Sequence, residues 1–226
     1  MQISPDLTVY CRWGPFALNA TIVNTWVVMA LLAGLSWLAT RKLSSEEIVS
    51  PWQNLCEAII LYVDRELDAI VRDKPASLLP FVATLFLFVG LSNLLTAIPW
   101  WSAPTGSLST TAGLALCVFV AAPLYGVRRR GLLRYLRSYL QPSPFMLPLN
   151  VFGEVSRTLA MAVRLFGNVM SGNMMGAILL LIAPFIVPVP LALLGLLTAM
   201  VHAYIFAVLA AVFIGAGLEN GTDNRN

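Results

Sequence analysis

One arginine stands in the most apolar part of the chain, and its chemistry is the first question that the sequence raises. No charged residue follows Arg164 until Glu219, and the only histidine, His202, lies in that stretch. An arginine near the middle of a bilayer costs about 2.5 to about 17 kcal/mol, depending on the method used. We therefore expect Arg164 to face an ion path or a partner's carboxylate, rather than to snorkel toward the membrane surface.

Other polar residues accompany Arg164 at helical spacing. Residues three and four positions apart share one face of a helix, and that face carries Arg157, Met161, Arg164, Asn168 and Ser171. Glu154 leads the same face, and with Arg157 it is read either as part of an ion path or as an ordinary interfacial ion pair. His202 is read either as an ion-path residue or as a hydrogen-bonded polar group between two helices.

Small residues lie beside Arg164 and let another helix approach closely. They are Gly167, Ser171, Gly172 and Gly176. The chain has no carboxylate deep in an apolar segment that could pair with Arg164. The partner of the arginine is therefore expected on another protein.

The composition indicates whether these residues lie in water or in a lipid membrane. Of the 226 residues, 58% are hydrophobic and 11% are charged, whereas soluble domains carry about 25% charged residues. We expect one integral membrane domain that spans residues 1–226. The three cysteines, Cys11, Cys56 and Cys117, match no metal or disulfide spacing, so neither a metal nor a cofactor is expected.

The polar residues must be positioned by an all-α fold of five transmembrane helices and one amphipathic helix. The expected spans are residues 21–39, 78–98, 110–127, 149–183 and 191–217, with the amphipathic helix at residues 50–72. The segment 149–183 would be about 50 Å long, so it must tilt or lie against something. Prolines after it, Pro184, Pro188 and Pro190, separate it from the last helix.

Basic residues predict the orientation in the membrane. Arg41 and Lys42 follow the first span, which indicates a cytoplasmic end there. Five arginines are expected in one cytoplasmic loop after the third span: Arg128, Arg129, Arg130, Arg134 and Arg137. Residues 1–20 would then lie outside, and the amphipathic helix and the C-terminus on the cytoplasmic side. Nucleic-acid binding is not favoured, because no soluble domain surrounds the arginines.

The run Arg164-Leu165-Phe166-Gly167-Asn168 resembles the signature of subunit a of the F-type ATP synthase. Four other segments resemble the same family: Pro80 to Phe88 with Ser92-Asn93, Leu147 to Asn150, Ile186 to Pro190, and Ala203 to Ala207. The resemblance covers about residues 10 to 218.

The resemblance implies a stator subunit that is not an enzyme on its own and that couples H⁺ or Na⁺ movement to rotation of a ring of c subunits. Two half-channels would reach the ring, and the last two helices would pack against it as a tilted hairpin. Arg164 would meet the ring's ion-binding carboxylate, since a fixed cation favours the ionised form of a nearby acid. The implied partners are the c ring, the b subunits of the peripheral stalk, the soluble sector indirectly, and the lipid of a bacterial inner membrane.

The sequence departs from the family's pattern along the expected ion path. Asn173 stands where many relatives have a glutamate, His202 where a glutamine is usual, and Ser107 and Ser109 where the outer loop often carries Asp and Asn. The expected ion-path residues are Asn168, Asn173, His202, Glu154, Arg157, Ser107 and Ser109. Neutral oxygen atoms suit sodium, and water with His202 suits protons, so both ions stay open. The departures resemble a divergent bacterial branch proposed to pump sodium.

Two other classes of protein are weighed against the stator. A self-contained secondary transporter would need a mid-membrane substrate site with paired charges or broken helices, which the sequence does not offer. A structural scaffold would give Arg164 no role. Neither the stoichiometry of a ring nor the direction of ATP turnover can be read from this chain.

Overall fold

The computed structural model describes residues 9–13, 16–40, 51–71, 75–98, 101–133, 135, 146–182 and 188–219. This part of the chain contains six long helices: α1 (Ala20–Thr40), α2 (Pro51–Ile70), α3 (Leu78–Leu94), α4 (Leu108–Arg130), α6 (Met146–Ile182) and α7 (Pro188–Glu219). Short 3-10 turns, η2 (Leu95–Ala97) and η3 (Pro104–Gly106), lie between α3 and α4. The predicted helical architecture is confirmed in this coarse form.

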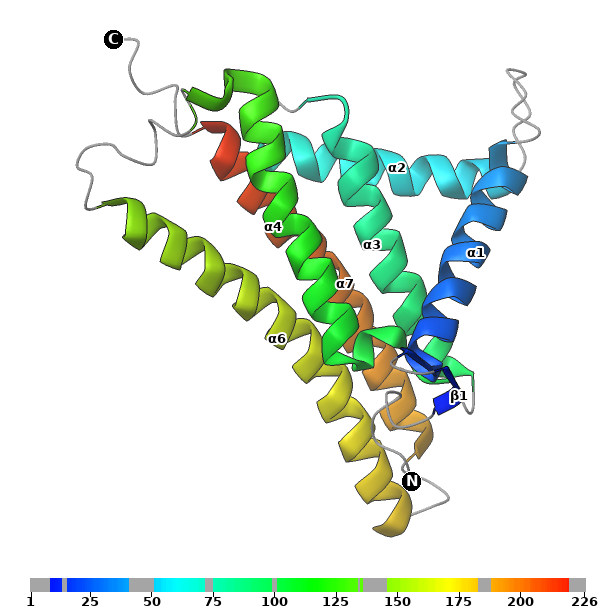
Figure 1. The fold of residues 1–226 in the computed structure, drawn as a ribbon. Coiled ribbons are helices and arrows are strands. Elements are labelled where there is room, and N and C mark those ends of the chain that lie inside the picture. The colour runs from blue at the N-terminus through cyan, green and yellow to red at the C-terminus, as the bar shows by residue number, and fades with distance from the viewer. Residues whose placement is uncertain are drawn as a thin grey trace.

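The helices α3, α4 and α7 form the centre of the bundle, and the other helices pack around them (Figure 1). α1 packs against α3, α2 crosses one end of the bundle, and α6 runs diagonally along α4 and α7. The most deeply buried apolar side chains of this core include Leu78, Val89, Val118 and Ile214. Burial of these side chains supplies the packing that holds α7 in place for the site described below.

In the described part of the chain, four helices are long and apolar enough to cross a membrane. The segments concerned are Ala20–Leu38, Leu78–Ala97, Leu108–Arg129 and Pro190–Leu218. α6, expected as a fifth span, is not among these four. Its apolar sequence is interrupted by Arg157, Arg164, Asn168 and Asn173, and such polar residues lower the mean hydropathy of a helix.

A short strand pair precedes α1, and the sequence pattern does not predict it. β1 (Val9–Trp13) and β2 (Phe16–Asn19) pair as an antiparallel hairpin with an irregularity between Val9 and Cys11. The hairpin lies at the end of the bundle where α1 begins, and α7 ends at the opposite end (Figure 1). Residues 9–13 and 16–19, expected only as parts of an outer segment, therefore have regular structure.

α6 and α7 both begin earlier in the sequence than predicted, so that prolines lie within their first turns. α6 begins at Met146 rather than at residue 149, and α7 begins at Pro188 rather than at residue 191. Each helix thus carries a proline in its first turn, Pro148 in α6 and Pro190 in α7. The first backbone N–H groups of a helix have no partner within it, so proline is tolerated there.

The arginines after the third span are not all in a loop. Arg128, Arg129 and Arg130 form the last residues of α4, which ends at Gly131 with φ 82°. Glycine adopts this positive φ without steric cost, so it ends the helix. The other two predicted loop arginines, Arg134 and Arg137, lie outside the described residues, as do Arg41, Lys42 and Pro184.

α2 packs through a narrow apolar stripe. Val63, Leu67 and Val71 recur every four residues and are 1 to 6% exposed, while most residues on the other faces of α2 are exposed. The stripe belongs to the same core cluster as α3 and α7. At Gly215 of α7, an added Cβ would lie 2.9 Å from Val71 Cγ2, so the absence of a side chain at Gly215 permits this close approach.

We predict that Gly215→Leu destabilises the protein by about 1–3 kcal/mol, the usual effect of overpacking a core. The larger side chain must displace Val71, which is 1% exposed. Thermal unfolding of the purified protein in detergent micelles measures the change.

Gly113→Leu on α4 is the matched control, because an added Cβ there meets nothing within 4 Å. That variant is expected to unfold at the wild-type temperature or slightly above it, since leucine favours a helix over glycine by up to about 1 kcal/mol. Equal effects of the two substitutions would contradict the packing argument.

Candidate functional site

Among the described side chains of α6, the buried ones all lie in a short stretch near the middle of the helix. Its buried residues are Met161, Ala162, Leu165 and Val169. No residue between 147 and 160 or between 170 and 181 is buried. The three residues Met161, Leu165 and Val169 recur every four positions, which is the spacing of one helix face. This face fixes α6 against α4 and α7 and leaves the other faces open.

Arg164 lies at the edge of that buried face. It is exposed, whereas its neighbour Leu165 is 2% exposed. A small hollow between α6 and α7 is lined by Met161, Arg164, Leu165, His202, Ile205, Phe206 and Leu209. The structure therefore brings Arg164 and His202, which are 38 positions apart in the sequence, to one hollow.

The guanidinium of Arg164 has no carboxylate partner among the described residues. The residues that share its hollow are otherwise apolar, apart from His202. Since an arginine remains charged at any physiological pH, the positive charge stays available to a group outside the part of the chain that the structure describes.

His202 is held by its own helix. Its Nδ1 atom lies 2.9 Å from the backbone oxygen of Thr198, one turn earlier on α7. A carbonyl oxygen can only accept a hydrogen bond, so Nδ1 carries the proton, and in the neutral ring Nε2 is left as an acceptor. The hydrogen bond of His202 thus lies within α7 and does not join two helices, and Nε2 is left as an acceptor for water.

The other predicted residues of α6 occupy different surroundings. Asn168 is half-buried one turn beyond Arg164, and its backbone oxygen accepts a hydrogen bond of 3.0 Å from Ser171 Oγ. Asn173 is exposed farther along the helix. Glu154 is half-buried and Arg157 is exposed, both in the half of α6 that precedes the contact stretch. These four residues do not line the hollow of Arg164 and His202.

The predicted serines lie at the start of α4. Ser107 is fully buried. Its Oγ lies 2.7 Å from the Oγ of Ser109, which is an exposed residue. The backbone oxygen of Ser107 also lies 3.2 Å from Thr111 Oγ1. The two serine hydroxyls thus meet, but they do not line the hollow that contains Arg164.

A buried polar network joins α3, η3 and α7, and the sequence analysis named its central residue, Asn93, only as part of the family resemblance. Asn93 is 1% exposed, and its Oδ1 accepts a hydrogen bond of 2.8 Å from Thr105 Oγ1. Its Nδ2 donates across 3.3 Å to the backbone oxygen of Ala199. An asparagine in an otherwise apolar helix is the signal that could have identified this network, since a buried amide needs partners.

Next to Asn93, Ser92 Oγ is buried with no hydrogen-bond partner among the described residues, and the same holds for Trp101 Nε1. Both atoms lie in segments adjoining the network of Asn93 and Thr105. Buried hydroxyl and indole groups normally find partners. The core at this end of the bundle therefore contains a hydroxyl and an indole N–H that can still form hydrogen bonds.

The glycines on the small-residue face of α6 have no close neighbour among the described residues. An added Cβ at Gly167, Gly172 or Gly176 would meet no atom within 4 Å. The glycines therefore do not serve close helix packing within the described residues, in contrast to Gly215 and Gly217, whose added Cβ atoms would crowd Val71 and the backbone of Ala122.

Comparison with known proteins gives a consistent result. The chain is 54% identical over 220 residues to ATP synthase subunit a 2 of Acaryochloris marina, with 97% of this chain and 94% of the relative covered. It is 53% identical over 216 residues to ATP synthase subunit a 1 of Chlorobaculum parvum, which covers 96% of each. Identity to ATP synthase subunit a of Nitrosospira multiformis is 50% over 224 residues, or 99% of this chain and 89% of the relative.

The similarity includes the helices that form the site. The model of the family described as ATP synthase A chain matches residues 22–215, a range that contains Arg164, His202 and the network around Asn93. Since the match spans most of the sequence and the relatives are aligned over nearly their whole length, the chain belongs to the ATP synthase A chain family.

Proposed function

We propose that Arg164 is the coupling residue of this ATP synthase subunit a and that the carboxylate it serves lies on a ring of c subunits. Members of the family are ion-translocating membrane subunits that do not catalyse ATP turnover themselves. The observation that carries the proposal is the exposed guanidinium, which shares a hollow with His202 and has no acid partner among the described residues.

The proposed mechanism follows from the charge of Arg164. A fixed cation stabilises the ionised form of a nearby carboxylate, so a ring carboxylate that passes Arg164 releases its ion. The ion therefore cannot be carried directly from one half-channel to the other past the arginine. At a membrane potential of 100 mV each charge moved supplies about 2.3 kcal/mol, which rotation of the ring can use.

Ion delivery to this point is assigned to polar side chains on α4, α6 and α7. His202 stands beside the arginine in the hollow, and its free Nε2 suits transfer of a proton or binding of water. We also assign Asn168, Asn173, Ser107, Ser109, Glu154 and Arg157 to the two half-channels. Exposure of Asn173 and Arg157 supports access from outside the chain.

The proposed topology contains five spans in a bacterial inner membrane. α6 is the fifth, tilted with α7 as a hairpin against the ring, because its open glycine face and exposed flanks leave room for a partner. The strand pair would lie outside, and α2 would lie as an amphipathic helix on the cytoplasmic surface. In support, the arginines that end α4 and the start of α1 lie at opposite ends of the bundle (Figure 1).

The proposed partners are the c ring, the b subunits and, indirectly, the soluble ATPase sector. Purification of the complex from membranes is expected to bring down an oligomeric c ring and the soluble subunits with this chain. A self-contained transporter would be purified without them, and family membership speaks against that alternative.

Arg164→Ala is expected to abolish ATP-driven ion pumping and ion-driven ATP synthesis in sealed vesicles while leaving the complex assembled. Arg164→Lys should fail or nearly fail as well, since an ammonium lacks the planar, permanently charged guanidinium. Pumping is measured by fluorescence quenching, and assembly by the subunits that co-purify.

Arg128→Ala is the matched control, because Arg128 is exposed at the end of α4 and does not line the hollow. It should pump at the wild-type rate. Normal pumping by Arg164→Ala would rule out the proposed mechanism.

The transported ion can be identified by carbodiimide labelling of the c ring in the assembled complex. If the neutral oxygens of Asn173, Ser107 and Ser109 serve sodium, added sodium at neutral pH is expected to protect the ring carboxylate and slow its labelling. Indifference of both labelling and ATP hydrolysis to sodium would assign the path to protons. Potassium at equal ionic strength is the control, because it separates specific binding from screening.

A further inference from the structure

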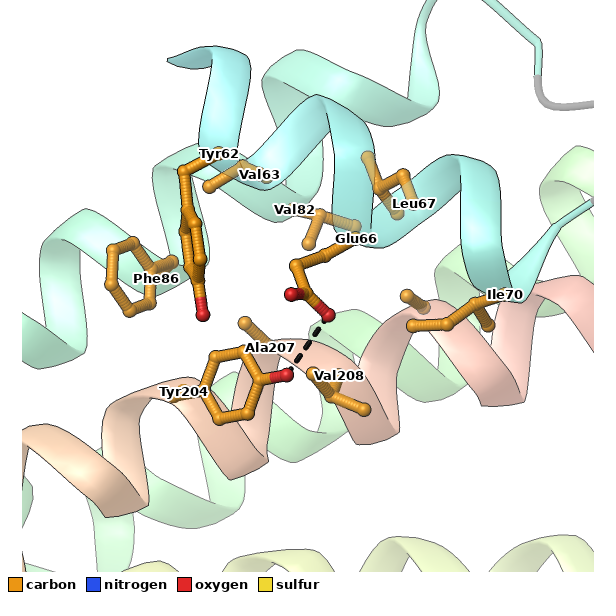
Figure 2. A pocket seen from close by; sticks show the side chains of 11 residues that line it. Tyr62, Val63, Glu66, Leu67, Ile70, Val82, Phe86, Tyr204, Ala207 and Val208 are labelled. Atoms are coloured by element: carbon orange, nitrogen blue, oxygen red, sulfur yellow. Dashed lines mark hydrogen bonds between the residues drawn. The ribbon is translucent and has the colours of Figure 1, made fainter. Parts of the chain in front are cut away.

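A hydrogen bond joins α2 to α7 far from Arg164. Tyr204 Oη donates to Glu66 Oε2 across 2.9 Å, and both side chains are half-buried. Figure 2 shows the two side chains reaching toward each other from the two helices, with Tyr62 beside them. The rings of Tyr62 and Tyr204 are 6.2 Å apart at their centroids and tilted by 43°. A bond to a carboxylate is stronger than a neutral one, so this contact resists rotation of Tyr204.

The surroundings of this bond are apolar. A pocket at the contact is lined by residues of α2, α3 and α7 that are mainly aliphatic or aromatic, among them Val63, Leu67, Val82 and Phe86. Polar groups in such surroundings are stabilised by pairing with each other, and the loss of one partner costs more than in water. Glu66 and Tyr204 therefore depend on each other.

Tyr204 and His202 lie on opposite sides of α7. Residues two positions apart are separated by about 200° around a helix. One side of α7 thus carries His202 and Phe206 toward α6 and its Arg164, while another carries Tyr204 toward α2. Any rotation of α7 about its axis would move both side chains together.

From this geometry we infer that Glu66 and Tyr204 are positioning residues that fix the rotation of α7 and thereby hold His202 at the hollow of Arg164. The inference rests on the proposed role of Arg164 and His202. The stripe of Val63, Leu67 and Val71 holds α2 against the bundle, but apolar contacts alone are not directional. The hydrogen bond adds a directional restraint to the packing of the core.

The restraint matters because α7 lies beside the helix that carries Arg164. Among the described side chains of α6, the buried ones lie only between Met161 and Val169. A c ring that rotates past α6 and α7 would repeatedly exert force on the side of α7 that faces α6. The bond between Glu66 and Tyr204 anchors α7 from the other side, through the helix that crosses the end of the bundle (Figure 1).

The test uses assembled complexes in sealed vesicles. Tyr204→Phe and Glu66→Ala are each expected to lower ATP-driven pumping about tenfold at equal amounts of complex, the rate equivalent of one charge-assisted hydrogen bond. Glu66→Gln should pump at close to the wild-type rate, because the amide oxygen still accepts a hydrogen bond from the Tyr204 hydroxyl.

A second readout reports the direction of the residue at position 202 directly. In a background with Cys11, Cys56 and Cys117 replaced by serine, His202→Cys is labelled with a water-soluble thiol reagent. Adding Tyr204→Phe is expected to change the labelling rate, and adding Glu66→Gln is expected to leave it unchanged. Wild-type pumping by Tyr204→Phe would overturn the inference, and so would lowered pumping with unchanged labelling.

Two substitutions serve as matched controls. Tyr125→Phe removes another tyrosine hydroxyl that bonds a neighbouring segment, with Oη 2.8 Å from the backbone oxygen of Ser77. Glu57→Gln removes an exposed carboxylate from the same helix as Glu66. Both should leave pumping and labelling unchanged. Normal pumping by Arg164→Ala would instead overturn the proposed function, whatever the result at Tyr204.

Discussion

A permanent positive charge on an apolar helix is the constraint on which the rest of the structure depends. A guanidinium cannot lose its proton, so its charge must be met by water or by an acid. Among the described residues, α6 provides no acid for Arg164 and buries only a short face around Leu165. The helix therefore leaves the arginine exposed, which is the basis for proposing an acid partner on another subunit.

α7 makes two kinds of contact, one on the side that faces α6 and another on the sides that face α3 and α2. Toward α6 it presents His202, whose Nδ1 is engaged with Thr198 and whose Nε2 is an acceptor. Toward α3 and α2 it makes directional bonds, at Ala199 with Asn93 and at Tyr204 with Glu66. The hydrogen bonds on these two faces hold the helix, and Nε2 of His202 remains an acceptor on the face toward Arg164.

Sequence reasoning could predict the helices and single out Arg164, because hydrophobic runs and an isolated charge are local features. α6 and α7 begin three residues before the predicted positions, because proline is tolerated in the first turn of a helix and so does not mark the first residue. The roles of Asn93 and Glu66 could not be predicted, because each depends on a partner more than ten positions away, Thr105 and Tyr204. The strand pair before α1 carries too few residues for a periodic signal.

The narrow attachment of α6 has a consequence for biogenesis. Among the described side chains of this 37-residue helix, the buried ones lie only between Met161 and Val169. A copy that has not yet met a neighbouring subunit would therefore hold the two ends of α6 in place less firmly than the helices of the central bundle.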